Sequence, residues 1–479
     1  MLKDIIKKEI LDHLLSAKFL FMFIICFVLI LLSVYMGVAG YLADKKVYDD
    51  DIAWDRLAWD PPNTYNILLT GSLKVYRAPQ TLGTLVKGVE DAAGRVSHTV
   101  LSEEVSLGES KYQSNPLTAV FGAFDLMFIV KMALSLFAIL LIYDTICGER
   151  EKGTLKLSLS NSLPRDRLLL GKFIGGYISL CIPLLLPMMI GLIYLSLHPM
   201  IVLTGEDWQR LGFIFLLFLL YLTVFFCLGM LVSSLTARSS TSLLVLLFIW
   251  SVWGIVVPKT SVIIAGMLRP IPVANEIYAQ KTAASKQVGE DFVPRDQELQ
   301  AQFNVKMIPM GGGSYRIEGD YQAFQAYQAA LSKLNEERDR VVTDNYEKIN
   351  RDFQLRKDAQ AALAKNISRI SPASALTFGA TSLARTGVDD YNRFWKAALD
   401  YKQVSRDWVR TNPDLRDEKG SYKPIDSAVI AAGLPQPALK YENLGGAIVR
   451  ILPDFIAMAL MIILLTGGAY FAFIRCDVR

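Results

Sequence analysis

A run rich in charged residues lies between two long apolar stretches of the chain. Residues 148–172 read GEREKGTLKLSLSNSLPRDRLLLGK, and Asp144 comes shortly before them. A charge at the middle of a bilayer costs about 2.5–3.5 kcal/mol on insertion scales, so this run must lie in water. Its side chains could pair with charges on a soluble partner, or the run could be an ordinary solvated loop. For Arg165 and Lys172, contact with phospholipid head groups is a third possibility.

The second half of this run combines its charges with an apolar surface. Four leucines are spaced through it, and Asn161 and Ser162 can cap a helix that begins near Pro164. We therefore predict a short helix parallel to the membrane, apolar on one side and charged on the other. Such a helix is suited to docking into a groove of a cytosolic protein.

Patterns that would indicate an enzyme are missing from the sequence. It has no Gly-x4-Gly-Lys-Ser/Thr for binding phosphates, no His-Glu-x-x-His and no Gly-x-Ser-x-Gly. Only three histidines occur, so we predict no metal site and no cofactor in this chain. The net charge of +4 comes from short basic flanks, which leaves no basic face for nucleic acid.

The composition indicates that the charged run is part of a membrane protein. Hydrophobic residues make up 52% of the chain, and its mean hydropathy is +0.32. A bilayer core of about 30 Å requires roughly 20 apolar residues in a helix. Six windows reach that length, and we predict a transmembrane helix in each: 19–41, 122–143, 173–196, 210–233, 241–266 and 447–474.

Short basic segments predict the orientation of these helices. Lysines precede the first window, Arg238 lies between the fourth and fifth, and arginines end the chain. The positive-inside rule therefore places both termini and the segment 144–172 in the cytoplasm. Residues 1–17 have an apolar face that includes Glu9 and His13, with lysines off that face, as in an amphipathic helix at the membrane interface.

Two long segments then lie outside the cytoplasm. Within residues 42–121, apolar and polar residues alternate in short stretches that Pro and Gly separate. This pattern predicts a mixed α/β insertion. Residues 267–446 are predicted to be mainly helical, with long helices at 320–371 and 387–411. The pattern leaves open whether 320–371 forms one rod or a hairpin, and residues 260–268 could form a re-entrant piece after the fifth span.

Two charges fall inside a predicted span. Asp125 and Lys131 lie in the outer half of the second window. An ionisable group within a membrane is a candidate for a translocation role. Asp125 could instead be solvated at the interface, and Lys131 could extend its ammonium toward it.

The charged run also resembles a known family. Its order of Asp144, Glu149-Arg150-Glu151, Gly153-Thr154-Leu155, Pro164-Arg165 and Gly171-Lys172 is similar to the inner loop of ABC-2 type permeases. Within that family it resembles the branch that includes the nitrous-oxide-reductase maturation permease and the gliding-motility permease. The six-span plan and residues 370–387 resemble the same branch.

This resemblance implies a fold and a function. The fold would be an all-α six-helix transmembrane domain, like ABC-2 or type V exporters, with a large mixed α/β, mainly helical extracytoplasmic domain. The chain would be the permease subunit of an ATP-driven exporter in the bacterial inner membrane. Two permeases, identical or paralogous, would combine with two separate ABC ATPase subunits, which bind the ATP and Mg²⁺.

The resemblance also assigns a coupling role to the inner loop. It would sit in a cleft of the ATPase, through residues Asp144, Glu149, Arg150, Glu151, Gly153, Thr154, Leu155, Pro164, Arg165 and Lys172. The large extracytoplasmic segments allow an alternative, in which ATP hydrolysis moves the outer helices against an envelope partner without translocating a substrate. Neither the exporter hypothesis nor the mechanical alternative identifies a substrate.

Overall fold

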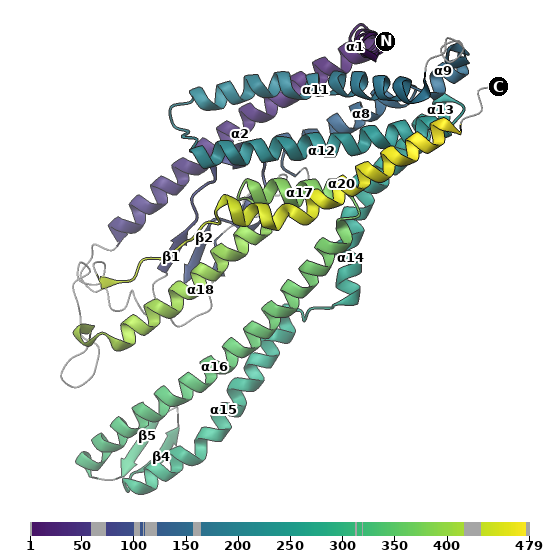
Figure 1. Ribbon diagram of the computed structural model, residues 1–479. Coiled ribbons are helices and arrows are strands. Elements are labelled where there is room, and N and C mark those ends of the chain that lie inside the picture. The colour runs from purple at the N-terminus through teal and green to yellow at the C-terminus, as the bar shows by residue number, and fades with distance from the viewer. Residues whose placement is uncertain are drawn as a thin grey trace. The chain divides into compact units, whose positions relative to one another are not determined.

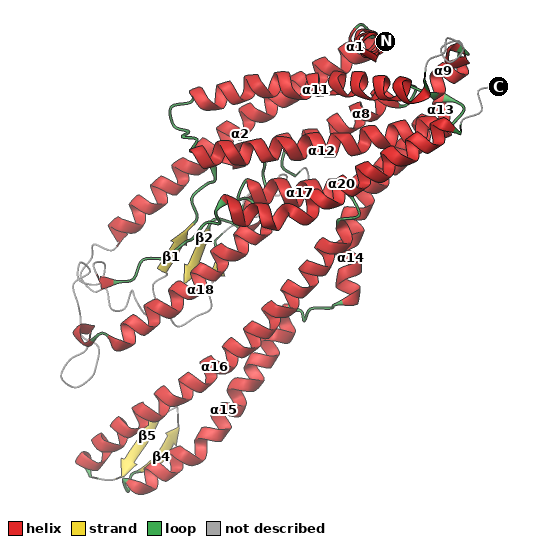
Figure 2. Cartoon of the chain, in the orientation of Figure 1, coloured by secondary structure: helices red, strands yellow, loops and turns green. Residues whose placement is uncertain are grey.

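The chain is mostly helical (Figures 1 and 2). Among the residues that the structure describes, six helices are long and apolar enough to cross a membrane. They confirm the six predicted spans, at Ala17–Trp54, Leu126–Glu151, Arg165–Leu197, Gly205–Leu235, Ser239–Leu268 and Leu444–Ile474. The computed structural model describes residues 2–58, 73–99, 106–108, 110, 122–156, 164–311, 314–318, 320–415 and 433–475. The chain divides into two compact units, Lys259–Ser368 and the remainder.

The first unit contains a bundle of long helices that lie side by side (Figure 1). Helix α12 (Gly205–Leu235) contacts α8 (Ser135–Ile142), α13 (Ser239–Ser251) and α20 (Leu444–Ile474). Its side chains Phe218, Tyr221, Phe225 and Phe226 are buried in the core. Helix α11 (Arg165–Leu197) packs on α2 (Ala17–Ala58).

Helix α2 continues well past the predicted span, which we expected to end at residue 41. Its length of 42 residues corresponds to about 60 Å, roughly twice the thickness of a hydrocarbon core. No Gly or Pro interrupts the polar residues 42–58, so the helix has no reason to end where its apolar part ends.

Two spans contain a π-helical turn. In the second span, η2 (Val130–Leu134) lies between α7 (Leu126–Ile129) and α8. A π turn leaves backbone groups without their usual helical partner. Here the Tyr221 hydroxyl donates to the Lys131 carbonyl at 2.8 Å, and the Ser135 hydroxyl donates to the same oxygen at 2.5 Å. Trp250 Nε1 of α13 donates to Ser135 Oγ at 2.8 Å, so the turn is held by neighbouring helices.

In the fifth span, η3 (Val252–Val256) joins α13 to α14 (Val257–Leu268). Residues 260–268 are part of α14 and do not form the separate re-entrant piece that we considered. A different short helix packs within the bundle: α17 (Pro372–Leu383) lies between α12 and α20. Ser371 caps α17 and donates to the Trp253 carbonyl in η3. Sequence analysis had assigned α17 to the extracytoplasmic domain.

A small antiparallel sheet lies at one end of the first unit. Its strands, in the order β1 (Leu73–Tyr76), β2 (Val96–Thr99), β3 (Ser106–Leu107), pack on α18 (Val388–Thr411) (Figure 1). Leu73 and Val75 are buried against Phe394 and Ala398 of α18. The shorter elements of this region are η1 (Thr81–Thr84), α4 (Glu90–Ala93) and η4 (Pro413–Leu415).

The second unit is a helical hairpin that ends in two strands (Figure 2). Helix α15 (Ala274–Gln302) packs against α16 (Tyr321–Ser368), and β4 (Lys306–Gly311) pairs with β5 (Ser314–Glu318) between them. The Tyr327 hydroxyl donates to Asp296 at 2.9 Å, and Arg295 binds both oxygens of Glu337. Helix α16 is continuous, which answers the question of rod or hairpin for 320–371 in favour of one rod of about 70 Å.

Candidate coupling site

The described residues of the charged run lie at one end of the first unit. Helices α1 (Leu2–Leu14) and α9 (Cys147–Glu151), the start of α11 and the end of α20 meet there (Figure 1). Arg165 Nη1 donates to the Ile474 carbonyl at 2.6 Å. A cation at the carboxyl end of a helix is favourable because the last carbonyls there have no helical partner.

Lys172 is the most buried charged residue of the predicted site. Its side chain is 3% exposed, and Nζ lies 2.7 Å from Glu149 Oε1 and 2.9 Å from Glu9 Oε1. A buried ammonium requires such partners, because removing it from water is costly. Lys172 therefore binds two carboxylates of its own chain, an arrangement that leaves it little access to a phospholipid head group.

Helix α9 is also attached on its other side. Glu151 accepts hydrogen bonds from the backbone N–H of Ser239 at 3.2 Å and from its hydroxyl at 2.9 Å, at the start of α13. A carboxylate is favoured at the amino end of a helix by the unpaired N–H groups there. The backbone N–H groups of Ile146 and Cys147 donate to Ser233 Oγ of α12 at 3.0 and 3.2 Å. Three helices of the bundle thus hold α9.

The residues on either side of α9 complete the loop. Asp144 pairs with Lys18 at 3.1 Å. Gly153 has a φ of +72°, a conformation that glycine adopts at little cost, and it ends the turn that follows α9. The Thr154 hydroxyl donates to the Glu149 carbonyl, and Leu155 is buried. Residues 151–154 are exposed and Arg150 is half-buried, so this tip is the part that a partner can touch.

The second half of the run is only partly described. Residues 157–163, where we expected an apolar helical surface, lie outside the described residues. Pro164 is the N-cap residue of α11. The helix that we expected to begin near Pro164 therefore begins there, but it is the first part of the third span and not a separate short helix.

The N-terminal helix packs tightly on α11. A Cβ atom built on Gly171 would lie 2.5 Å from Ile5 Cγ2, and one on Gly175 would lie 2.7 Å from Glu9 Cβ. Glycines four residues apart allow two helices to approach closely. The face of α1 that we expected at the membrane interface therefore meets α11. Burial lowers the pKa of the His13 imidazole on this face, although Glu9 acts in the opposite direction.

The two charged residues of the second span have local structural contacts. Asp125 is 2% exposed and caps α7, accepting from the Phe128 N–H at 2.8 Å. Its second oxygen accepts from the Lys87 N–H at 2.7 Å, so it also holds the segment after η1. Lys131 belongs to η2 and is half-buried.

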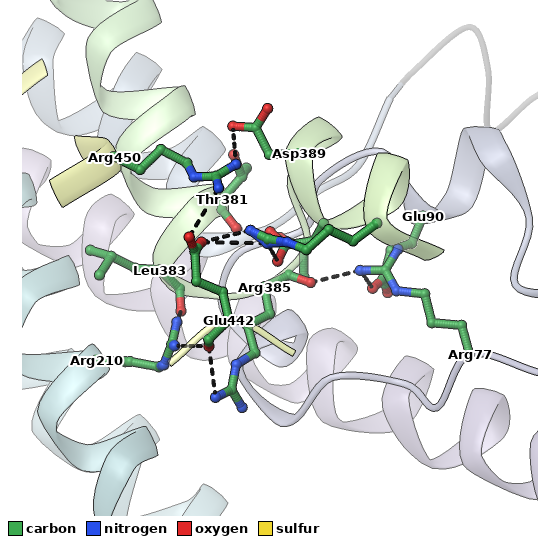
Figure 3. A network of polar contacts seen from close by, with 12 residues as sticks. Arg77, Glu90, Arg210, Thr381, Leu383, Arg385, Asp389, Glu442 and Arg450 are labelled. Carbon is green, nitrogen blue, oxygen red and sulfur yellow. Dashed lines mark hydrogen bonds and ion pairs between the residues drawn. The ribbon is translucent and has the colours of Figure 1, made fainter. Parts of the chain in front are cut away.

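At the far end of the bundle, sequence analysis missed a network of buried and half-buried charges (Figure 3). Arg210, at the start of α12, is 0% exposed and contacts Glu206 Oε1 at 2.9 Å. It also donates to the carbonyls of Leu383 and Glu442 at 3.0 and 2.7 Å. The Glu442 carboxylate, just before α20, binds Arg393 at 2.6 Å and Arg450 at 2.9 Å.

Arg385 connects this network to the small sheet. It follows α17 with a φ of +58°, and its Nη2 donates to Glu206 Oε1 at 2.9 Å. Its carbonyl accepts from Arg77 Nη2 at 2.7 Å, and the same Arg77 nitrogen pairs with Glu90 at 3.0 Å (Figure 3). We call Arg77, Arg210, Arg385, Arg393 and Arg450 with their partners the arginine joint. The one sequence signal for it was Arg210 at the edge of a predicted span, four residues after Glu206.

Sequence analysis also missed the partners inside the loop region. Glu9 had a signal, since it is an acidic residue on the apolar face of α1. Ser233 and Ser239 had none, because serines at the ends of apolar spans are common. The structure brings together Glu149, Glu151, Lys172 and Asp144 with partners on four helices, whereas Asp125 and Lys131 lie elsewhere in the second span.

The comparisons with known proteins agree with this architecture. A family model described as ABC-2 family transporter protein matches residues 4–478. No curated protein matches the chain. The family match covers both units, all six spans and the loop at 144–172. The chain therefore belongs to the ABC-2 family of transporter proteins and is a multi-pass membrane permease of an ABC transporter.

Proposed function

We propose that this chain is the permease subunit of an ATP-driven exporter and that its 144–172 loop couples it to a separate ATPase. The observation that carries the proposal is the attachment of α9. Glu149, Glu151 and the N–H groups of Ile146 and Cys147 fix this helix to α11, α13 and α12. A loop with no mechanical role does not need three anchors on three helices.

The mechanism follows from these anchors. The exposed tip at 151–154 offers Lys152 and a tight turn to a protein cleft. A displacement of the tip passes through these short contacts, of which those to Ser233 are buried, and so reaches the third, fourth and fifth spans together. Rocking of these spans against a second permease would open a path for the substrate.

The partner supplies the chemistry. The family implies an ABC ATPase, and we assign ATP and Mg²⁺ to that subunit because this sequence has no phosphate-binding Gly-x4-Gly-Lys-Ser/Thr. Two permeases and two ATPases would form the transporter in a bacterial inner membrane. The basic residues of α1 and of the loop support a cytoplasmic location for this end under the positive-inside rule. Residues 370–387 support a relationship to the nitrous-oxide-reductase maturation and gliding-motility branch.

A second candidate function is mechanical work on an envelope partner without translocation. The hairpin of α15 and α16 favours it, because α16 is a continuous rod. Just after α16, Arg369 pairs at 2.8 Å with Asp454, a residue of α20 that is 1% exposed. A displacement of the last span could therefore reach the hairpin through the chain itself.

The test reverses charge at the tip. Arg150→Glu with Lys152→Glu is expected to leave the permease in the membrane while the copurified ATPase and its stimulated hydrolysis are lost. Lys7→Glu with Lys8→Glu, on the exposed side of α1, is the matched control for the same change of charge. Full retention of the ATPase and of stimulated hydrolysis in the tip variant would refute the coupling role. Transport of a copurified lipid or protein into proteoliposomes separates export from mechanical work.

A further inference from the structure

The packing of the helices does not by itself explain why one group of charged side chains is buried. Lys172 of α11 lies between Glu9 of α1 and Glu149 of α9, and the imidazole Nε2 of His13 is 4.0 Å from the second oxygen of Glu9. Lys172 and Glu9 are both less than 10% exposed. Replacing such a buried ion pair with apolar residues is often neutral or stabilising. Stability alone is therefore a weak reason for this arrangement, and a positional role is the better one.

The group connects elements that are far apart in the sequence. Glu9 is 163 residues from Lys172, and Glu149 is 23 residues from it. Helix α1 is fixed on α11 by the close approach at Gly171 and Gly175. These two helices consequently form one rigid body, and the bond between Glu149 and Lys172 is its charged link to α9.

Glu149 and Glu151 face different parts of the bundle. Two residues correspond to about 200° around a helix, so their side chains leave α9 on opposite sides. Glu149 binds Lys172 on the body of α1 and α11, while Glu151 binds Ser239 at the start of α13. Helix α9 therefore bridges the third and fifth spans.

We propose that Lys172 is a positioning residue that makes the N-terminal helix α1 and the third span move together with α9. This inference rests on the proposed coupling function. It assigns α1 to the moving part of the coupling unit and not to a passive anchor on the lipid surface. Cutting the bond to Glu149 should leave the exposed tip intact for the ATPase but disconnect it from α1 and α11.

Glu149→Leu removes the ion pair between Glu149 and Lys172 with the fewest other changes. It removes the acceptor at similar volume, and Lys172 keeps Glu9 as a buried counter-charge. Glu149→Asp is the conservative variant, which retains the carboxylate and should restore coupling in part. Asp12→Leu, an exposed acidic residue of α1, is the matched control. A second cut, Lys172→Met with Glu9→Gln and Glu149→Gln, leaves no unpaired buried charge and replaces Glu149→Leu if that variant fails to fold.

The experiment uses the full chain copurified with its ATPase. Stimulated ATP hydrolysis should fall about tenfold in Glu149→Leu, within the range of ordinary coupling free energies, while the ATPase remains bound. Spin labels carried by unnatural amino acids at the exposed positions 7 and 156 report the distance between α1 and the residues just past the tip. We expect one narrow distance in the unaltered chain with and without a nonhydrolysable ATP analogue, and a broadened or shifted distance with the analogue in Glu149→Leu.

The outcomes distinguish a failure of this inference from a failure of the proposed function. If the unaltered chain does not bind or stimulate an ATPase, the proposed function fails. If it does, but Glu149→Leu retains full stimulation and a narrow distance in both states, the positioning role of Lys172 is overturned. Loss of the ATPase from Glu149→Leu would overturn it as well, because the carboxylate would then belong to docking.

Discussion

Replacing Arg385 with glycine and, separately, with alanine will separate the two roles of this residue in the arginine joint. The backbone of Arg385 has a φ of +58°, in the left-handed region, and its side chain pairs with Glu206 at 2.9 Å. Both variants lose the side chain equally. Only alanine must keep a Cβ atom in the left-handed conformation.

The expected magnitudes follow from these two terms. A non-glycine residue in the left-handed region costs about 1–2 kcal/mol. Glycine loses more chain entropy on folding than alanine does, and this offsets about 0.5–1 kcal/mol of the advantage of glycine. Glycine should therefore be the more stable variant by about 0.5–1 kcal/mol. Loss of the partly exposed pair with Glu206 costs up to about 1 kcal/mol in both, since Arg210 still contacts that carboxylate.

Thermal unfolding of the purified chain in one detergent, followed by intrinsic fluorescence, measures this order. The unaltered chain and Arg385→Gly should unfold at similar temperatures, and Arg385→Ala about one degree lower, because about 1 kcal/mol is divided by the unfolding entropy of 479 residues. Arg393→Gly and Arg393→Ala, inside α18, provide the control, because there alanine should be the more stable variant. An Arg385→Ala chain as stable as Arg385→Gly would refute the left-handed conformation and the geometry of the joint that depends on it.

Three further predictions test other parts of the molecule. Arg210→Met should lower the free energy of unfolding by about 1–3 kcal/mol, because the carbonyls of Leu383 and Glu442 lose their charged donor while Glu206 keeps Arg385; an unchanged free energy of unfolding would contradict this. Gly175→Leu should displace α1, because even a Cβ atom there meets Glu9 at 2.7 Å, and the N-terminus should become sensitive to limited proteolysis; unchanged protection would show that α1 packs elsewhere. Burial lowers the pKa of His13 in the folded chain below its ordinary value of 6.5. As the pH falls below 6.5, the unfolded chain therefore binds the proton first, and the free energy of unfolding falls. Above that pH both states are neutral, and His13 causes no loss of stability. His13→Gln should flatten the fall in thermal midpoint between pH 7.5 and about 5.5, and an unchanged slope would assign that fall to other groups.

The secondary structure followed local sequence patterns closely in several places. The spans were predictable because the cost of placing polar groups in a bilayer acts on every residue separately. Helix α18 begins at Val388, one residue after the predicted start, and ends at Thr411. Helix α16 begins and ends near Gly319 and Pro372, which were visible as helix-breaking residues.

Other features had no local signal. Helix α17 has a composition that suits an extracytoplasmic segment as well as a bundle, and only its neighbours α12 and α20 decide that it packs between them. The π turns depend on Tyr221 and Trp250, which satisfy exposed backbone groups from other helices. Patterns along one segment cannot contain such partners.

The sequence alone predicted six helices long and apolar enough to cross a membrane, and the described residues contain six such helices. It also led us to expect a cytoplasmic loop at 144–172 and an ATPase in another subunit. Each of these follows from the properties of single residues or short motifs. The tertiary structure decided the partners: Lys172 with Glu9 and Glu149, Glu151 with Ser239, and Arg385 with Glu206. These pairs join residues distant in the chain, and a buried charge takes the partner that packing brings within reach.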